Sequence, residues 1–460
     1  MYVSETTSGG LRRRASASSS RFRHPTQVVA SGFGSAILIG TAVLSLPIAT
    51  ESGERAPFVD ALFTATSAVC VTGLVTVDTG QYWSTFGEVV ILALIQVGGL
   101  GIMTLATLFA ILVSGRLGLR TQLIAQAETK TARLRDVPHL VRNVVLFNVG
   151  SEVVIATILS VRFFTGYDMP LGEAVYDGVF HAISAFNNAG FSVYSDSLMG
   201  FVSDPWITLT VAIAFIVGGI GFPVAFELAR SWRRPRTWSV LTRITLAVTV
   251  PLLVIGTVVI GLTEFSNPGT LGPLDDQGKF LAAFFASATA RTAGFNSIDV
   301  AAMHPESWLF TDLLMFIGGG SAGTAGGIKV TTLGLLALVI WAELRGESKV
   351  NVARRRVPES TQRQALAIGL LSVGLVAVVT MVLMHLSPHR LDQVMFEVVS
   401  AFGTVGLSTG ITADLPRSGH VLIIVLMFVG RIGPLTLFSA LALRERARLF
   451  EYPEERTIVG

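Results

Sequence analysis

The feature that most constrains this 460-residue chain is a short segment that occurs four times. Each copy is rich in Ser and Ala and ends in Gly followed by Leu or Phe. The copies occupy residues 63–74, 181–191, 285–295 and 399–407, and their glycines are Gly73, Gly190, Gly294 and Gly406, spaced by 117, 104 and 112 residues. A four-fold repeat at this spacing in an apolar chain predicts a pore built from four covalently linked quarters.

Composition places these repeats in a membrane. The chain is 51% hydrophobic and only 14% charged, which is typical of an integral membrane protein. Eight apolar stretches are long enough to span a bilayer: 28–48, 89–113, 141–164, 207–228, 244–262, 309–340, 365–386 and 421–443. One repeat segment, too short to cross, lies between the members of each consecutive pair, which predicts a re-entrant hairpin. The expected fold is therefore an all-α integral membrane protein. Four span–pore-loop–span repeats, with eight spanning helices and four re-entrant pore hairpins, would surround one quasi-four-fold pore.

The basic residues predict the orientation of these repeats. The expected organisation is an N-terminal arm (1–27), repeats at 28–113, 139–232, 238–345 and 361–448, and a C-terminal tail (449–460). Five segments, up to Arg23, at 114–140, 230–243 and 344–363, and from Arg444 onward, carry 25 Lys and Arg. The alternating segments 51–84, 165–205, 264–308 and 387–418 carry only five. Both termini should therefore lie in the cytoplasm of a multi-pass protein of the cell (plasma) membrane, with the hairpins entering from outside. The basic clusters at 12–14 and 354–356 are interpreted as topology determinants and contacts to membrane lipids, so no nucleic-acid partner is expected. Cys70 is the single cysteine, which excludes an intrachain disulfide.

The repeat segments have the properties of a selectivity filter. A short helix that points its partially negative C-terminal end at the membrane centre stabilises a dehydrated cation, and the returning chain offers carbonyls in place of water. Gly is needed where the backbone takes angles forbidden to other residues or where four chains crowd one axis. A single small-residue pattern would favour helix packing, but four matched copies favour the filter. The predicted filter residues are Val71, Thr72, Gly73, Asn188, Ala189, Gly190, Thr292, Ala293, Gly294, Thr404, Val405 and Gly406.

The second span of each repeat is also rich in glycine, at 97–101, 217–221, 317–320 and 429–433. For three of these spans, close helix packing is a sufficient explanation. The third has six glycines within 318–329, which cannot hold a regular helix in lipid. A break at membrane depth must line a cavity, so this loop should lie under the filter and could block the pore. A phosphate-binding loop is not favoured, because Lys329 does not follow a Gly directly and no strand precedes it; no nucleotide is expected to bind this chain itself.

Three basic residues lie within the apolar regions. Arg431 would cost at least ~2.5 kcal/mol in lipid, so it should face protein or water and could donate to the carbonyls of the broken span. It could also be a structural cap of backbone carbonyls with no gating role. Lys329 either contacts the loop or extends to the membrane interface. Arg291 is expected to point behind the filter and to form a salt bridge with a carboxylate.

The strings 69–74, 186–191, 290–296 (ARTAGFN) and 403–408, with the glycine-rich second spans, resemble the Trk/Ktr/HKT family of potassium and sodium translocators. The resemblance covers nearly the whole chain and implies the four-repeat fold, with K⁺ at the filter carbonyls. Four filter glycines are typical of the potassium-selective bacterial members. Eight spans and the tail 452–460 are most similar to the Ktr membrane subunit. The resemblance also implies a gate, with Lys329 and Arg431 beside an intramembrane loop made of Gly318, Gly319, Gly320, Ser321, Ala322, Gly323, Thr324, Ala325, Gly326 and Gly327.

The same resemblance implies partners. Similar subunits form homodimers on a cytosolic ring of RCK/KTN-type regulatory subunits that bind ATP or ADP, and the basic segment 345–363 could dock it. Sodium is a possible activator, since some relatives are activated by it. The sequence thus predicts a channel-like subunit for potassium uptake and no enzymatic activity. The alternative is a Na⁺- or H⁺-coupled secondary transporter, which would place ionisable residues at the midplane of inverted repeats. Here the repeats are parallel, and Glu88, Glu152 and Glu227 are expected nearer the ends of spans.

Overall fold

The structure is a computed structural model, and it describes residues 25–101, 104, 137–347, 349–352 and 355–433. Most of the predicted N-terminal arm, the C-terminal tail and most of the basic segment 114–140 lie outside the described residues. So do the ends of the first and fourth predicted repeats.

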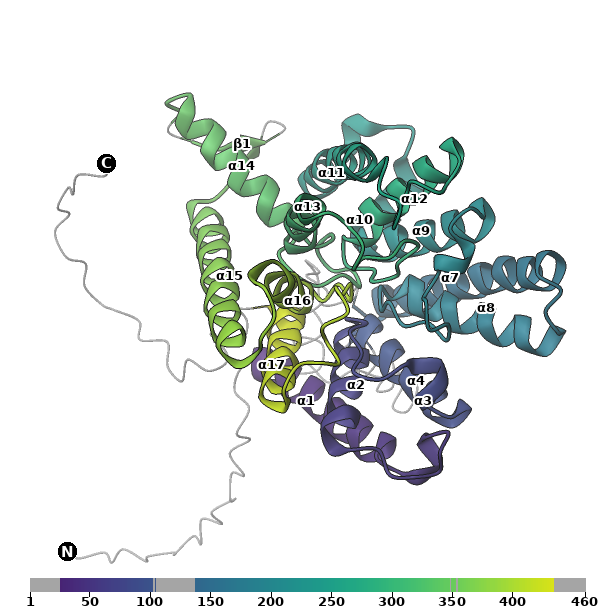
Figure 1. Ribbon diagram of the computed structural model, residues 1–460. Helices are drawn as coiled ribbons and strands as arrows, with labels where there is room; N and C mark the ends of the chain where they lie inside the picture. The colour runs from purple at the N-terminus through teal and green to yellow at the C-terminus, as the bar shows by residue number, and fades with distance from the viewer. Residues whose placement is uncertain (1–24, 102–103, 105–136, 348, 353–354, 434–460) are drawn as a thin grey trace, which may run out of the picture.

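The described helices fall into four groups that follow the predicted repeats (Figure 1). The first comprises α1 (Pro25–Leu44), η1 (Pro47–Ala49), α2 (Phe58–Cys70), α3 (Thr79–Tyr82) and α4 (Thr85–Leu100). The second comprises α7 (Val137–Gly166), α8 (Leu171–Phe186), η3 (Met199–Phe201), α9 (Pro205–Gly219) and α10 (Phe222–Ser231). The third comprises η4 (Pro235–Thr237), α11 (Val240–Glu264), α12 (Asp276–Thr289), α13 (Pro305–Phe316) and α14 (Val330–Leu344), and the fourth α15 (Glu359–Leu386), α16 (Leu391–Gly403) and α17 (Arg417–Ile432). A two-stranded antiparallel hairpin, β1 (Asn351–Val352) and β2 (Arg355–Arg356), connects the last two groups.

The first long helix of each group could cross a membrane. Within the described residues, four helices are long and apolar enough to do so: Gln27–Leu44, His139–Gly166, Val240–Glu264 and Glu359–Leu386. A fifth span is possible if α9 and α10, which meet at an angle of 105°, are counted together. The sequence predicted eight spans, so the second span of each group departs from a single straight helix.

These departures occur at glycines. We predicted uninterrupted spans at 89–113, 207–228 and 421–443, but the chain leaves the helix at Gly101, Gly221 and Gly433, where φ is +80°, +100° and +91°. This left-handed backbone stops a helix and is readily adopted only by glycine. Helix packing alone was therefore an incomplete explanation of the glycines. In the third group the break is longer, and no α-helix is described between Phe316 and Val330.

The same stretches also contain glycines that allow close packing. A Cβ built on Gly98, Gly218 or Gly430 would lie 2.0 Å from a carbonyl oxygen of Val69, Phe186 or Phe402, respectively. These carbonyls lie at equivalent places near the ends of α2, α8 and α16. The second helix of each of these three groups is thus pressed against the end of its own short helix.

The four groups form a closed ring. The second helix of each group packs on the short helix of the next, in the contacts α4–α8, α9–α12, α13–α16 and α17–α2. Figure 1 shows this order as the colour passes from purple through teal and green to yellow around a common centre. The last group therefore closes on the first.

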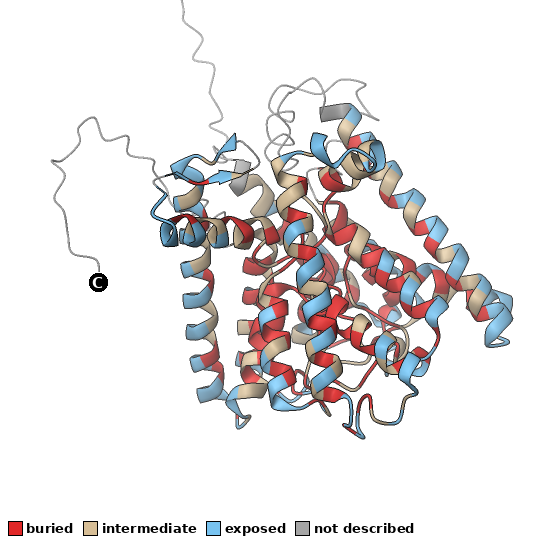
Figure 2. Cartoon of the chain, turned by 90° about the horizontal axis from the view of Figure 1, so that it is seen from above, coloured by how far each residue is buried: buried red, intermediate tan, exposed pale blue. Residues whose placement is uncertain are grey.

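Burial follows the same plan. The short helices lie inside, and every residue of α2 from Phe63 to Cys70 is buried. Much of the surface of the long outer helices is exposed (Figure 2). Large apolar side chains lie there; Leu370 of α15, for example, is 74% exposed. Exposed apolar surface on long helices around a buried interior is typical of a protein that faces lipid.

Candidate functional site

The four predicted filter glycines meet at the centre of the ring of helices. A Cβ on Gly73 would lie 2.5 Å from the carbonyl oxygen of Ala189, on Gly190 2.8 Å from that of Ala293, on Gly294 2.3 Å from that of Val405, and on Gly406 2.1 Å from that of Thr72. Each glycine thus faces the residue before the next glycine, and the fourth faces the first string. No side chain fits at any of the four positions without displacing backbone. We call this arrangement the glycine ring.

The backbone of each string is left-handed at two alternate positions. The glycines of the ring have φ of +90°, +71°, +80° and +98°. The residues two positions earlier, Val71, Asn188, Thr292 and Thr404, have φ of +52°, +57°, +73° and +49°. Such angles cost a residue with a Cβ about 1–3 kcal/mol and persist where the surrounding structure enforces them, commonly at functional sites. All four strings carry this strain at the same place.

Hydroxyl groups at the ends of the short helices hold the strings. The Oγ of Ser67 accepts from the backbone N–H of Gly73 (3.0 Å), and Ser400 does the same for Gly406 (3.1 Å). In the other two copies the hydroxyl donates instead, from Ser184 to the carbonyl of Phe191 (2.7 Å) and from Thr289 to that of Phe295 (2.6 Å). The sequence analysis missed these residues. The signal was a Ser six residues before the Gly in three copies; the third copy has Ala288 there and uses Thr289, five residues before its Gly.

The glycine-rich loop 318–327 lies against two of the strings. The hydroxyl of Thr324 donates to the Oδ1 of Asn188 at 2.7 Å. A Cβ on Gly326 would lie 1.9 Å from the Oγ1 of Thr404. The loop therefore contacts the second and fourth strings at the strained position two residues before the glycine.

The loop is compact and is hydrogen-bonded to the break in the second group. Its ends are joined by the N–H of Gly318, which donates to the carbonyl of Ile328 at 2.8 Å. The N–H of Gly320 donates to the carbonyl of Gly219 at 2.7 Å, and a Cβ on Gly320 would lie 1.9 Å from the carbonyl of Ile220. The glycines of this loop thus serve close approach between two backbones.

Two basic side chains hold the loop. The guanidinium of Arg431 donates to the carbonyl of Thr324 in the loop and to the carbonyl of Gly98 in α4. It thereby links the fourth, third and first groups. The ammonium group of Lys329 donates to the carbonyl of Ala325 and, at 3.4 Å, to that of Gly326. Of the two alternatives for Lys329, the structure shows the contact with the loop.

The expected salt bridge of Arg291 is absent from the described residues. Its guanidinium instead donates to the carbonyl and to the hydroxyl of Thr249 on α11, both at 3.3 Å. The two Nη atoms are bonded to neutral oxygens, whereas the buried Nε has no hydrogen-bond partner among the described residues. A hydrogen-bonding partner on a neighbouring helix could not be identified from the sequence.

The expectation for Glu152 was also wrong. This residue lies at the middle of the 30-residue helix α7 and is 7% exposed, so it is not near the end of a span. The predicted apolar stretch 141–164 already has Glu152 at its middle, so the sequence itself contained this signal. Glu88 does lie in the first turn of α4, and Glu227 lies within the short helix α10, near the end of the predicted span 207–228.

A polar cluster supports the second group away from the ring. The buried carboxylate of Asp204 accepts from the Nε of Arg162 (2.7 Å), the hydroxyl of Tyr167 (3.0 Å) and the N–H of Trp206 (2.9 Å). The last of these bonds caps α9. Burial and the hydrogen bond to Asp204 raise the pKa of Tyr167 to about 12. The cluster fixes the connection between α7 and α9.

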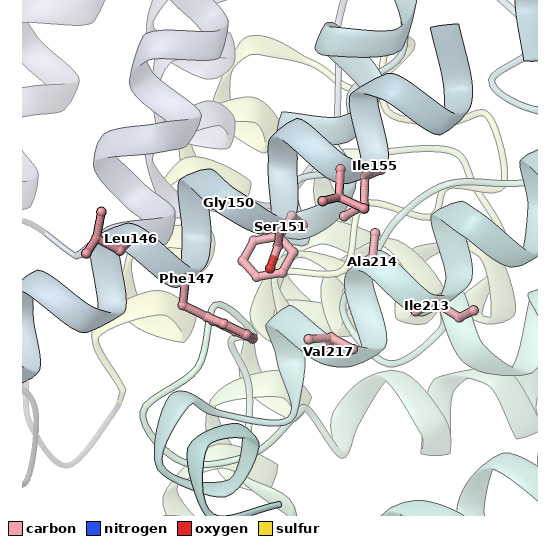
Figure 3. A pocket seen from close by; sticks show the side chains of 10 residues that line it. Leu146, Phe147, Gly150, Ser151, Ile155, Ile213, Ala214 and Val217 are labelled. Carbon is pink, nitrogen blue, oxygen red and sulfur yellow. The ribbon is translucent and has the colours of Figure 1, made fainter. Parts of the chain in front are cut away.

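A groove of about 410 Å³ runs between α7 and α9 (Figure 3). Its walls include Leu146, Phe147, Ile213 and Val217, and it reaches Phe186 at the end of α8. These walls are almost wholly hydrocarbon. The groove therefore offers no ligands for a dehydrated cation, whereas the glycine ring brings four backbone carbonyls together.

Known proteins resemble the chain over nearly its full length. A family model described as "TrkH: Cation transport protein" matches residues 3–452. The chain is 42% identical over 436 residues to the Ktr system potassium uptake protein B of Bacillus subtilis, covering 95% of this chain and 97% of that protein. It is 36% identical over 442 residues to the potassium/sodium uptake protein NtpJ of Enterococcus hirae, covering 95% and 97%. The crystal structure of the potassium transporter TrkH from Vibrio parahaemolyticus matches with a TM-score of 0.72 at 17% identity, covering 93% of this chain and 86% of that one. The names of these relatives describe transport proteins, in agreement with the expectation that the chain is not an enzyme.

Proposed function

Because the chain belongs to the TrkH family of cation transport proteins, we propose that it is the membrane subunit of a Ktr-type potassium uptake system. K⁺ would pass through the glycine ring, down its electrochemical gradient. The observation that carries this proposal is the closed cycle in which each ring glycine faces a carbonyl of the next string. The names of the relatives from B. subtilis and E. hirae support potassium as the permeant ion.

The twelve predicted filter residues are the proposed ion ligands, through their backbone carbonyls. The helices α2, α8, α12 and α16 end where the four strings begin. Their C-terminal ends carry partial negative charge, which favours a dehydrated cation at the ring. Left-handed backbone at two alternate positions of each string is the strain that such a filter stores.

We assign eight spans to the membrane, four of them interrupted. In this assignment the short helices enter from outside as re-entrant hairpins, and both termini lie in the cytoplasm of a plasma-membrane protein. The excess of Lys and Arg in the terminal and inter-repeat segments supports this orientation.

The proposed gate is the loop 318–327, with Lys329 and Arg431. Its contacts with Asn188 and Thr404 put it directly beside two filter strings. Arg431 holds it through the carbonyl of Thr324, and its positive charge would oppose a permeating cation. Movement of this loop would open the pathway.

Regulation is proposed to come from other chains. Two copies of this subunit would form a homodimer on a cytosolic ring of RCK/KTN-type subunits, and the ATP or ADP bound there would move the loop. Sodium is proposed as a further activator. The basic segment 345–363 is a suitable docking surface for that ring.

The proposal is tested with the chain reconstituted in liposomes under a K⁺ gradient. We expect K⁺ flux that follows the imposed voltage and needs no gradient of Na⁺ or H⁺. Gly→Ser at each ring glycine, assayed with Na⁺ competition, should weaken the preference for K⁺. Wild-type selectivity in all four variants would contradict the filter assignment.

One observation favours a second candidate function, Na⁺- or H⁺-coupled secondary transport. Glu152 is a buried acid at the middle of a long apolar helix, which is where coupled secondary transporters place ionisable residues. In that case K⁺ flux in the liposomes would require a Na⁺ or H⁺ gradient at fixed stoichiometry. The parallel order of the four groups favours the channel-like function.

A further inference from the structure

Glu152 anchors a buried network that reaches the second filter string. Its Oε1 and Oε2 accept from the side-chain amide of Gln96 on α4 at 2.9 and 2.8 Å. Its Oε1 also accepts from the amide of Asn187 at 2.8 Å. Asn187 directly precedes the filter residue Asn188 in the chain. The carboxylate therefore binds the residue that directly precedes the filter residue Asn188.

The rest of the network fixes both amides. Asn187 also donates to the Oε1 of Gln96 (2.7 Å) and to the carbonyl of Ile183 (2.9 Å). Asn148 accepts from Gln96 at 2.9 Å and donates to Asn187 at 3.4 Å. Asn148 and Asn187 have no exposed surface. A network satisfied in this way holds its members in one arrangement.

The small size of Gly99 makes room for this network. A Cβ on Gly99 would lie 1.9 Å from the Oδ1 of Asn187. The glycine-rich stretch of α4 thus lets the Asn187 side chain pass between α4 and α7. Close helix packing and the position of this amide depend on the same residue.

No basic side chain within the described residues forms an ion pair with Glu152. Its partners in the network are neutral amides that donate to it, which suits the ionised carboxylate. An ionisable side chain within a membrane-spanning helix is costly, and such residues mark ion pathways.

We propose that Glu152 is a positioning residue that sets the ion specificity of the second filter corner. It fixes the amide of Asn187 and hence the backbone of Asn188 to Gly190, and the permeating cation compensates its charge. This inference rests on the proposed function, because it gives Glu152 a role in a K⁺ pore.

The other three strings differ at the equivalent position. The residue three before the ring glycine is Cys70, Asn187, Arg291 or Gly403. Asn187 is bonded to a carboxylate, whereas Arg291 brings a cation and is bonded to the oxygens of Thr249. The second and third corners are therefore backed by opposite charges. The backbone ring is nearly symmetric, but the electrostatic field behind it is not.

The test measures the half-saturating K⁺ concentration and the K⁺/Na⁺ permeability ratio in liposomes. Glu152→Gln removes the charge and places an amide opposite two amide donors. We expect the half-saturating K⁺ concentration to rise about tenfold and the permeability ratio to fall. Glu152→Asp keeps the charge and should retain more of the K⁺/Na⁺ preference than Glu152→Gln. Values equal to wild type for Glu152→Gln would overturn the inference.

Glu264→Gln is the matched control. Glu264 is, like Glu152, a buried acid; it accepts from Asn267 (2.6 Å), Thr270 (2.7 Å) and the N–H of His304 (2.9 Å), but it lies at the end of α11. We expect this variant to change thermal stability without changing either ion measurement. An equal fall in the K⁺/Na⁺ ratio in both variants would show that loss of any buried acid perturbs the filter, and would also overturn the inference.

Asn187→Ala is a second variant that tests the inference even if Glu152→Gln fails to fold. It removes the amide link and should lower the permeability ratio in the same direction; an unchanged ratio contradicts the inference. If both single variants fold, the double variant should be no worse than the more affected single one, since they break one link. A wild-type chain without K⁺ flux would instead refute the proposed function, which separates the two failures.

Discussion

The glycine ring is built differently from the contacts around its strings. We call these contacts the support layer; they are made by the loop 318–327, Arg431 and Glu152. In the ring, four strings from four groups adopt the same left-handed backbone and face one another through carbonyls. In the support layer, the loop comes from the third group, Arg431 from the fourth and the carboxylate of Glu152 from the second. A site made of backbone can be repeated because any sequence with glycine at the right position supports it. A site made of side chains can differ in each quarter and so carry control.

The largest effect should follow from a methyl group in the ring. In Gly406→Ala the new Cβ would lie 2.1 Å from the carbonyl oxygen of Thr72, at a residue whose φ is +98°. We expect K⁺ flux to fall by about two orders of magnitude, because collision and backbone strain act together. Gly374→Ala in α15 is the control, since its Cβ would meet nothing within 4 Å. Normal flux in Gly406→Ala would contradict the difference proposed between the ring and the support layer.

The next largest effect should come from the support layer, where a substitution should raise K⁺ flux instead of lowering it. Arg431→Gln removes the donors that hold the loop to the carbonyls of Thr324 and Gly98. We expect K⁺ flux without regulatory subunits to rise about fivefold to tenfold, with the K⁺/Na⁺ ratio unchanged, because a freed loop blocks less. Arg390→Gln, which loses an exposed pair with Asp392, should leave flux unchanged. If Arg431→Gln leaves flux at the wild-type level, Arg431 is a structural cap only.

A smaller effect should separate stability from transport. Asp204→Ala leaves Arg162 and Tyr167 without their shared acceptor and uncaps α9. We expect a loss of about 1–3 kcal/mol in stability, seen as a lower melting temperature of the purified protein. The partial exposure of Arg162 keeps the loss at the lower end of what a buried ion pair would cost. The permeability ratio should not change, and a change would mean that support far from the ring also sets selectivity.

The smallest effect is expected in the apolar groove. Gly150 lies on α7 with nothing within 4 Å of a Cβ built on it. Gly150→Ala should therefore be accommodated and should stabilise the helix by up to about 1 kcal/mol, because Ala has the higher helix propensity. Flux should match that of the unchanged chain. A fall in flux would indicate that the groove, which ends at Phe186, influences the nearby string.

Sequence reasoning located the ring because the backbone demand repeats. Four glycines in matched segments are visible in one chain, and so is a stretch too rich in glycine to form a helix. The strain at Val71 and Thr404 was not predictable, since β-branched residues disfavour left-handed angles and are held there by the packed structure.

Side-chain partners were harder to predict than backbone. Hydropathy shows that Arg291 and Glu152 lie in apolar surroundings, but not which neighbouring helix faces them. Arg291 donates to the oxygens of Thr249, where a carboxylate was expected. Glu152 accepts from the side-chain amides of Gln96 and Asn187. The glycine-rich stretches have two roles, and only the first follows from composition. Gly98, Gly218 and Gly430 allow close packing, whereas the glycines at 101, 221 and 433 end helices.

The closure of the ring between α17 and α2 has a consequence for how the protein is made. The bond from Arg431 to Gly98 joins residues 333 positions apart, and the ring contact between Gly406 and Thr72 joins residues one position further apart. Contacts of such high sequence separation form late, since the loop between them must first be closed. During synthesis the first group of helices therefore cannot make its contacts with the last group until that group has been made. A selective pathway therefore cannot exist until the chain is nearly complete, so a half-made subunit would not present this ring to ions.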